Sequence, residues 1–124
     1  MAAGARLLPR ARIRRPAEFK QVFAEGIRIG GGSTRAPLGL ACRPNGLDHP
    51  RLGLAIARKA VATATGRNRV KRLVREEFRQ HQNELPAVDL VFYGHAGLAR
   101  ADAAQIRQTL AEFWLKVIDR CGGC

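Results

Sequence analysis

Cysteines, acidic residues and long apolar runs are scarce in this chain of 124 residues, and each shortage excludes a class of protein. Three cysteines cannot form a fully paired disulfide framework, so the sequence favours a reducing compartment, and we expect the cytoplasm. No apolar run approaches the roughly 18 residues of a membrane-spanning helix, so we expect no partner in a membrane. Residues 1–15 are rich in arginine, like a transit peptide, but they lack its serines and its continuous apolar segment. We therefore interpret them as a basic arm.

Residues that could carry catalysis or bind metals are also few and widely separated. The histidines stand apart, without the spacing of a metal site: His49, His81 and His95. Cys121 and Cys124 have the spacing of a redox motif, but two thiols do not complete a zinc site, and we interpret residues 119–124 as a flexible tail. The glycine-rich residues 30–34 lack the Lys-Ser/Thr ending of a P-loop, and no paired carboxylates are placed to hold metal ions. We predict a binding protein with no catalytic residue and no metal site of its own.

Positive charge is abundant and unevenly distributed. The chain has 22 Lys and Arg residues against 10 Asp and Glu residues, which gives a formal net charge of +12. Residues 1–28 carry seven basic side chains against two acids, and residues 51–79 carry nine against two, whereas residues 80–124 are nearly neutral. A field polarised in this way steers a protein towards polyanions.

The strongest signal lies in residues 66–79, which hold five arginines and one lysine against two glutamates. A helix of about 100° per residue places an apolar stripe on one face: Val70, Leu73, Val74 and Phe78. The other face gathers polar and basic side chains: Asn68, Arg69, Lys71, Arg72, Arg75 and Arg79. A solvated helix face normally mixes both signs of charge in i,i+4 pairs, but most cations here lack such a partner. The segment predicts a helix that packs on a core and binds the phosphates of a nucleic acid.

The remaining periodicities predict a single α+β domain, residues 1–124, a sandwich with the order α-β-β-β-α-β-α. Helices are expected at residues 16–26, 62–82 and 101–118, and strands at residues 27–31, 35–43, 51–57 and 88–93. The second and third strands both alternate large with small side chains. We expect these two strands to be neighbours, with the large side chains on a core and the small ones forming the open floor of a groove.

Several of these segments carry a resemblance to a known family. The resemblance lies mainly in three runs. These are Arg51-Leu52-Gly53-Leu54-Ala55-Ile56, then Arg58-Lys59, then Gly66-Arg67-Asn68-Arg69 at the start of the basic helix. In these runs the chain strongly resembles the protein subunit of bacterial ribonuclease P. Further matches are Leu8-Pro9, the run from Arg14 to Phe19, Phe23, Glu84-Leu85-Pro86 and Asp89-Leu90-Val91. The likeness covers about residues 7–118.

The resemblance implies a protein cofactor of a catalytic RNA. In that family the holoenzyme is an endoribonuclease that removes the 5′ leader of precursor tRNA and leaves a 5′-phosphate on the tRNA. Catalysis resides in the RNA and requires Mg²⁺. The implied partners are the ribonuclease P RNA subunit and precursor tRNA, with the protein a monomer within the holoenzyme. The implied fold is a sandwich like domain 2 of ribosomal protein S5, with a left-handed β-α-β crossover.

The resemblance also implies roles for individual residues. The residues implied to contact the RNA subunit are Arg67, Asn68, Arg69, Lys71, Arg72 and Arg75. The residues implied to lie at a cleft for the leader, between the first helix and the sheet, are Phe19, Phe23, Arg58 and Lys59. The chain departs from the family at Gly94 and His95, where a basic residue is common, and at residues 60–66, which lack cations sometimes found there. Two alternatives stay open: a general RNA-binding or RNA-chaperone protein of ribosomal type, and a protein-only nuclease.

Overall fold

The structure, a computed structural model, describes residues 11–29 and 37–121. Its elements in chain order are α1 (Pro16–Glu25), β1 (Ile27–Ile29), β2 (Leu38–Pro44), β3 (Arg51–Ala55), α2 (Ala64–His81), β4 (Val88–Gly94) and α3 (Ala103–Cys121), with 3₁₀ helices at Gln82–Glu84 and Ala96–Arg100. The predicted order α-β-β-β-α-β-α is confirmed. The prediction that the last helix ends at residue 118 is wrong, since α3 continues to Cys121. The glycine-rich residues 30–34 and Cys124 lie outside the described residues.

The four strands form one mixed sheet in the order β1-β2-β4-β3. β4 pairs antiparallel with β2 and parallel with β3, so α2 is the crossover between the parallel strands β3 and β4. The prediction that β2 and β3 are neighbours is therefore wrong, because β4 lies between them. β4 is buried from Val88 to Phe92, and a strand that is buried on both faces suits the middle of a sheet covered on both sides.

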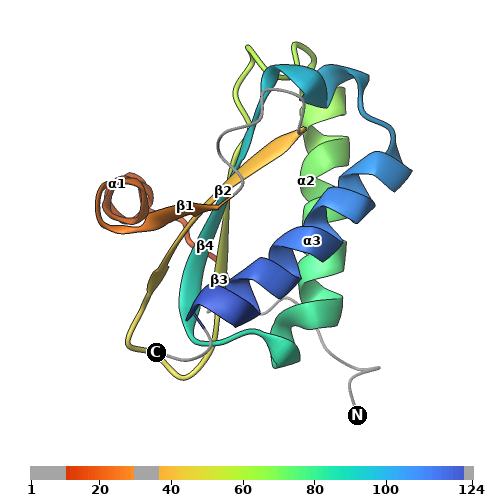
Figure 1. The fold of residues 1–124 in the computed structure, drawn as a ribbon. Coiled ribbons are helices and arrows are strands. Elements are labelled where there is room, and N and C mark those ends of the chain that lie inside the picture. Colours follow the sequence, from red (N-terminus) through yellow and green to blue (C-terminus); the bar gives the residue numbers. More distant parts are fainter. Residues whose placement is uncertain (1–10, 30–36, 122–124) are drawn as a thin grey trace.

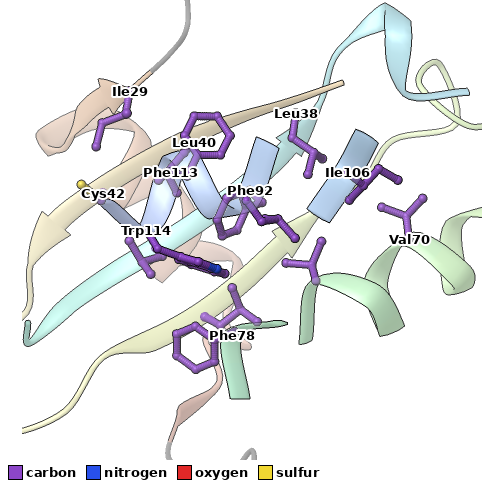
Figure 2. Packing of buried hydrophobic residues seen from close by; sticks show 14 of the residues in the cluster. Ile29, Leu38, Leu40, Cys42, Val70, Phe78, Phe92, Ile106, Phe113 and Trp114 are labelled. Atoms are coloured by element: carbon purple, nitrogen blue, oxygen red, sulfur yellow. The ribbon is translucent and has the colours of Figure 1, made fainter. Parts of the chain in front are cut away.

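Helices cover both faces of the sheet, with α2 and α3 on one side and α1 on the other (Figure 1). β2 and β4 turn large side chains towards α2 and α3, among them Leu38, Leu40, Cys42 and Phe92 (Figure 2). The Phe92 ring lies 5.7 Å from that of Phe113 and 5.5 Å from that of Trp114, both on α3. The predicted stripe of α2 is buried here except for Leu73, which is half-buried. This packing is the main core, and it fixes which face of α2 points outwards.

The opposite face of the sheet carries the small side chains of β2 and β3, but it is not the open floor that the sequence predicts. A second cluster covers it: Ile13, Val22, Ala41 and Val91, with Phe19, Phe23, Ala55 and Tyr93 packed at its margin. Gly53 of β3 illustrates how close the packing is. A Cβ built on Gly53 would lie 2.8 Å from Cε1 of Phe19 and 3.2 Å from Cβ of Ile13. The small residues thus make room for α1 and the segment before it, rather than for solvent.

The end of the basic arm lies along the outer edge of β3. Arg12 forms a parallel bridge with Leu52, and the amide of Ile13 donates a hydrogen bond of 2.8 Å to the carbonyl of Leu52. Ala11 and Ile13 are buried. The segment therefore pairs backbone groups that an edge strand would otherwise leave open, and it carries Arg12 and Arg14 to this edge of the sheet.

Candidate nucleic-acid interface

α2 presents the basic face that its periodicity predicts. Thr63 caps the helix, because its Oγ1 accepts a hydrogen bond of 3.0 Å from the amide of Gly66. Val70, Val74 and Phe78 are buried in the core, which turns the other side of the helix outwards. The predicted contact residues on that side are exposed, as for Asn68, Arg69 and Arg72, or half-buried, as for Lys71 and Arg75.

Acidic side chains do not neutralise this face. Within residues 11–29 and 37–121, no carboxylate forms an ion pair with Arg69, Lys71, Arg72 or Arg75. The two glutamates of α2 are engaged elsewhere, Glu76 with Arg79 and Glu77 with Arg107 of α3 at 4.0 Å. The hydrogen bond from Arg79 lowers the pKa of Glu76, so Glu76 stays ionised in that pair. The basic face, defined as Arg69, Lys71, Arg72 and Arg75, is therefore left to an anionic partner.

Arg67 differs from Arg69 although both belong to the Arg-Asn-Arg motif. Nη1 of Arg67 donates hydrogen bonds of 3.0 Å to the carbonyl oxygens of both Val61 and Ala62, in the loop before α2. Arg67 is half-buried, whereas Arg69 is exposed. Arg67 thus holds the crossover loop against the helix, and only its remaining N–H groups stay free for a phosphate.

Arg12 joins the basic face from the N-terminal segment. It lines an open hollow of about 340 Å³ together with Asn68, Arg72, Arg75, Glu76 and Arg79. Burial, together with the positive charge of Arg12, lowers the pKa of Arg75. Two like charges held close together oppose each other in the free protein, and a bound anion relieves that repulsion. The sequence placed Arg12 only in a general basic arm, because the pairing of this segment with Leu52 leaves no local pattern.

A second hollow, of about 170 Å³, lies at the edge of β3 and connects the basic face with α1. Its lining residues are Arg12, Ile13, Arg14, Phe19, Leu52, Leu54, Lys71 and Arg75. Phe19 is half-buried here and shares the hollow with the cations of α2. An aromatic ring beside several cations suits a single strand of nucleic acid, since bases stack on the ring and phosphates bind the cations. We call this site the β3-edge hollow.

Phe23 belongs to an aromatic group that the sequence did not predict. Its ring lies 5.7 Å from that of Tyr93 on β4, and the guanidinium of Arg28 lies 4.9 Å and 5.4 Å from the two ring centroids. His95 packs edge-on against Tyr93 at 5.3 Å. The alternation of β4 was a usable signal, because it places Tyr93 on the same face as Val91, towards α1.

Arg58 and Lys59 lie apart from Phe19. Both are exposed in the turn after β3, and neither lines the β3-edge hollow. A Cβ built on Gly94 would lie 2.6 Å from Cβ of Ala60, so this turn packs on the end of β4. Because β3 and β4 run parallel, the turn stands at the same end of the sheet as Tyr93. The structure therefore associates Arg58 and Lys59 with the aromatic group of Phe23 and Tyr93 more closely than with Phe19.

Arg51, the first residue of the motif in β3, binds two carboxylates within the fold. Its Nε and Nη2 donate hydrogen bonds of 2.8 and 2.7 Å to the two carboxylate oxygens of Asp89, and its Nη1 donates one of 2.9 Å to Glu18 of α1. The bonds to Asp89, and then to Glu18, raise the pKa of Arg51 above its ordinary value. This network ties α1 to the sheet and engages all three guanidinium nitrogens of Arg51 with carboxylates of the fold.

The described residues offer neither a metal centre nor a membrane span. Among residues 11–29 and 37–121, no three or more His, Cys, Asp and Glu side chains are grouped so that they could hold a metal ion. In the same part of the chain, no helix combines the length and the apolar character needed to cross a membrane.

Comparison with known proteins identifies the family. The model of the family Ribonuclease P matches residues 7–118. The chain belongs to the ribonuclease P protein family. A relative from Methylococcus capsulatus, named ribonuclease P protein component, is 40% identical over 112 residues, which cover 90% of this chain and 84% of the relative. One of the same name from Haemophilus influenzae is 40% identical over 107 residues, 86% of this chain and 87% of the relative. Membership assigns the chain to tRNA processing, as the protein component of a ribonucleoprotein.

Solved structures of ribonuclease P proteins have the same fold. The protein from Staphylococcus aureus superposes with a TM-score of 0.76 at 27% identity, covering 86% of this chain and 94% of that one. The protein from Thermotoga maritima, solved in complex with 1-(4-fluorophenyl)-2-thiourea, superposes with a TM-score of 0.73 at 32% identity, covering 83% of this chain and 96% of that one. The expected α+β sandwich is therefore confirmed by structure as well as by sequence.

Proposed function

We propose that this chain binds the catalytic RNA of ribonuclease P through α2 and the 5′ leader of precursor tRNA through the face that carries α1. It serves as the protein subunit of the endoribonuclease, and the RNA carries out the cleavage. The observation that carries the proposal is the basic face of α2. Arg69, Lys71, Arg72 and Arg75 have no carboxylate partner in the described chain, and Arg12 adds a further charge beside Arg75.

Binding to the catalytic RNA follows from the chemistry of these cations. Guanidinium groups match phosphate oxygens in both charge and geometry, and each phosphate that is neutralised releases condensed counterions. The complex brings an RNA enzyme and an RNA substrate together, and the protein cations reduce the repulsion between the two. Affinity should therefore fall steeply with salt concentration.

Binding to the leader follows from the β3-edge hollow and the aromatic group beside it. Phe19 shares the hollow with Lys71 and Arg75. Phe23 lies against Tyr93 of β4, and the turn that holds Arg58 packs on Gly94 at the end of that strand. Stacking and phosphate contacts accept any base, which a protein acting on many different leaders requires. Only the precursor has a leader, so these contacts favour precursor over mature tRNA.

Mg²⁺ belongs to the RNA in this proposal. The described side chains contain no group of three metal ligands, so no step is assigned to a metal ion held by the protein. The part of the protein is to bind and orient the two RNAs.

Reconstitution with the matching catalytic RNA tests the proposal. Cleavage of precursor tRNA is scored at low Mg²⁺ concentration with the RNA alone, the protein alone and both together, using wild type, Arg72→Ala and Lys116→Ala. Both variants remove one charge, but Lys116 lies exposed on α3, outside the basic face. We expect multiple-turnover cleavage only when both components are present. Arg72→Ala should reduce this cleavage, and Lys116→Ala should leave it unchanged. Cleavage by the protein alone would point to a protein-only nuclease, and equal binding of unrelated RNAs without stimulated cleavage would point to an RNA chaperone.

A further inference from the structure

A third hollow, of about 330 Å³, lies between α2 and the first turns of α3. Its lining residues are Arg69, Val70, Arg72, Leu73, Glu76, Ala103, Ile106 and Arg107. Val70 and Ile106 are buried and Leu73 is half-buried, so the floor is aliphatic. Ala103, the first residue of α3, is exposed and too small to fill the space above that floor. We call this site the α2–α3 hollow.

The rim of the hollow is mainly positive. Arg69 and Arg72 are exposed and have no carboxylate partner within the described residues. Arg107 approaches Glu77 only at 4.0 Å, and its side chain is 56% exposed. Glu76 is the one acidic residue among those that line the hollow, and it forms an ion pair with Arg79. An occupant of this hollow therefore needs an apolar surface for the floor and negative charge for the rim.

The size of the hollow limits what that occupant is. Its α2 side runs only from Arg69 to Glu76, which corresponds to about 10 Å along a helix. A docked helix would need a longer apolar groove, whereas a volume near 300 Å³ is typical of small-ligand sites. The first turn of α3 contributes little direct anion binding, because Asp102 already accepts a hydrogen bond of 2.8 Å from the amide of Gln105. The charge must be recognised by the three arginines.

We infer that the α2–α3 hollow holds one unpaired nucleotide of the catalytic RNA. Its base lies on Leu73 and Ile106, and its flanking phosphates contact Arg69, Arg72 and Arg107. A base has two apolar faces, and arginine planes also stack on unpaired bases. This inference rests on the proposed function, because it takes the RNA bound by α2 as the source of the nucleotide. It gives the basic face a specific anchoring point in addition to its general attraction for phosphates.

A filled hollow tests the inference. Ala103→Trp puts an indole over the floor from an exposed position, and Ala104→Trp adds the same side chain one residue along α3, where it does not line the hollow. Affinity for the catalytic RNA is measured with both variants and wild type, and the base edges of the bound RNA are probed chemically. Ala103→Glu and Ala104→Glu form a second matched pair. The carboxylate of Ala103→Glu would repel a phosphate at the hollow, and Ala104→Glu adds the same charge outside the lining.

We expect Ala103→Trp to weaken binding at least about fivefold, because the apolar burial of one base on the aliphatic floor is lost, while Ala104→Trp binds like wild type. One unpaired nucleotide should be protected in the wild-type complex and reactive in the Ala103→Trp complex. Equal affinities and unchanged protection would overturn the inference while leaving the proposed function intact. A change in self-association alone would overturn it in favour of an interface between copies of the chain. Failure of wild type to bind the RNA would instead refute the proposed function.

Discussion

Removal of Arg51 should unfold the protein more readily without directly weakening its contact with RNA. The side chain of Asp89 is 2% exposed, and it receives two hydrogen bonds from Arg51 and one of 3.0 Å from Nδ2 of Asn45. Arg51→Gln leaves that buried carboxylate without a counter-charge and also releases Glu18 of α1. The loss falls on the fold because all three guanidinium nitrogens of Arg51 donate to carboxylates of the fold.

The magnitude follows from the burial of the pair. Removing one partner of a buried ion pair costs about 3–5 kcal/mol. Arg51 is 19% exposed and Asn45 still donates to Asp89, so we place Arg51→Gln at the lower end, about 3 kcal/mol. For a domain of this size that corresponds to a fall in Tm of roughly 10 °C.

Urea unfolding of wild type, Arg51→Gln and Glu25→Gln measures the effect. Glu25 accepts a hydrogen bond of 2.8 Å from Arg43, but its side chain is 59% exposed, so Glu25→Gln should cost less than about 1 kcal/mol. Because the pKa of Arg51 is raised, its contribution is complete at any pH below its ordinary value and should not vary between pH 5 and 9. Equal losses of unfolding free energy in Arg51→Gln and Glu25→Gln would refute the reasoning. A lower RNA affinity of Arg51→Gln than of wild type, measured under conditions where the variant is folded, would also refute it.

Three further predictions concern the two proposed RNA surfaces. Arg69→Ala should weaken binding of the catalytic RNA and reduce the slope of log affinity against log salt by about one, with unfolding unchanged, since Arg69 is exposed. Arg67→Ala should instead lower the free energy of unfolding by about 1–2 kcal/mol, because two loop carbonyls lose a charged donor; a wild-type urea midpoint would contradict this. Phe19→Ala should reduce the ratio of precursor to mature tRNA affinity at least about fivefold, and an unchanged ratio would remove Phe19 from the leader site.

Local periodicity predicted the elements because each helix must bury one stripe on a neighbour. Val70, Val74 and Phe78 recur at helical spacing and are buried as expected. Strand order was not predictable in the same way. β2 and β3 are close in sequence, but β4, from a distant segment, takes the position between them because it is buried on both faces. Pairing between strands depends on contacts that no single segment encodes.

The candidate site shows the same division between local and distant information. The resemblance to the family implied the same role for Arg67 and Arg69, since both are arginines of one motif. Only the structure separates them, through the carbonyl oxygens of Val61 and Ala62 that Arg67 binds. The alternation of β4 directs Tyr93 towards α1, but only the structure shows that α1 brings Phe23 beside its ring.

The position of Arg12 also changes how the two proposed RNA surfaces relate to each other. Sequence reasoning separated a basic helix for the catalytic RNA from a cleft for the leader. In the structure, Arg12 and Arg75 line two hollows. One is the open hollow of about 340 Å³ that they share with Asn68 and Arg72, and the other is the β3-edge hollow, which Phe19 also lines. The same two cations therefore face both proposed RNA ligands. Under the proposed function, phosphates of the catalytic RNA would relieve the repulsion between Arg12 and Arg75 and would thereby fix the wall of the hollow proposed for the leader. Assembly with the catalytic RNA and preference for precursor tRNA should then be coupled through this pair, rather than arise on independent faces.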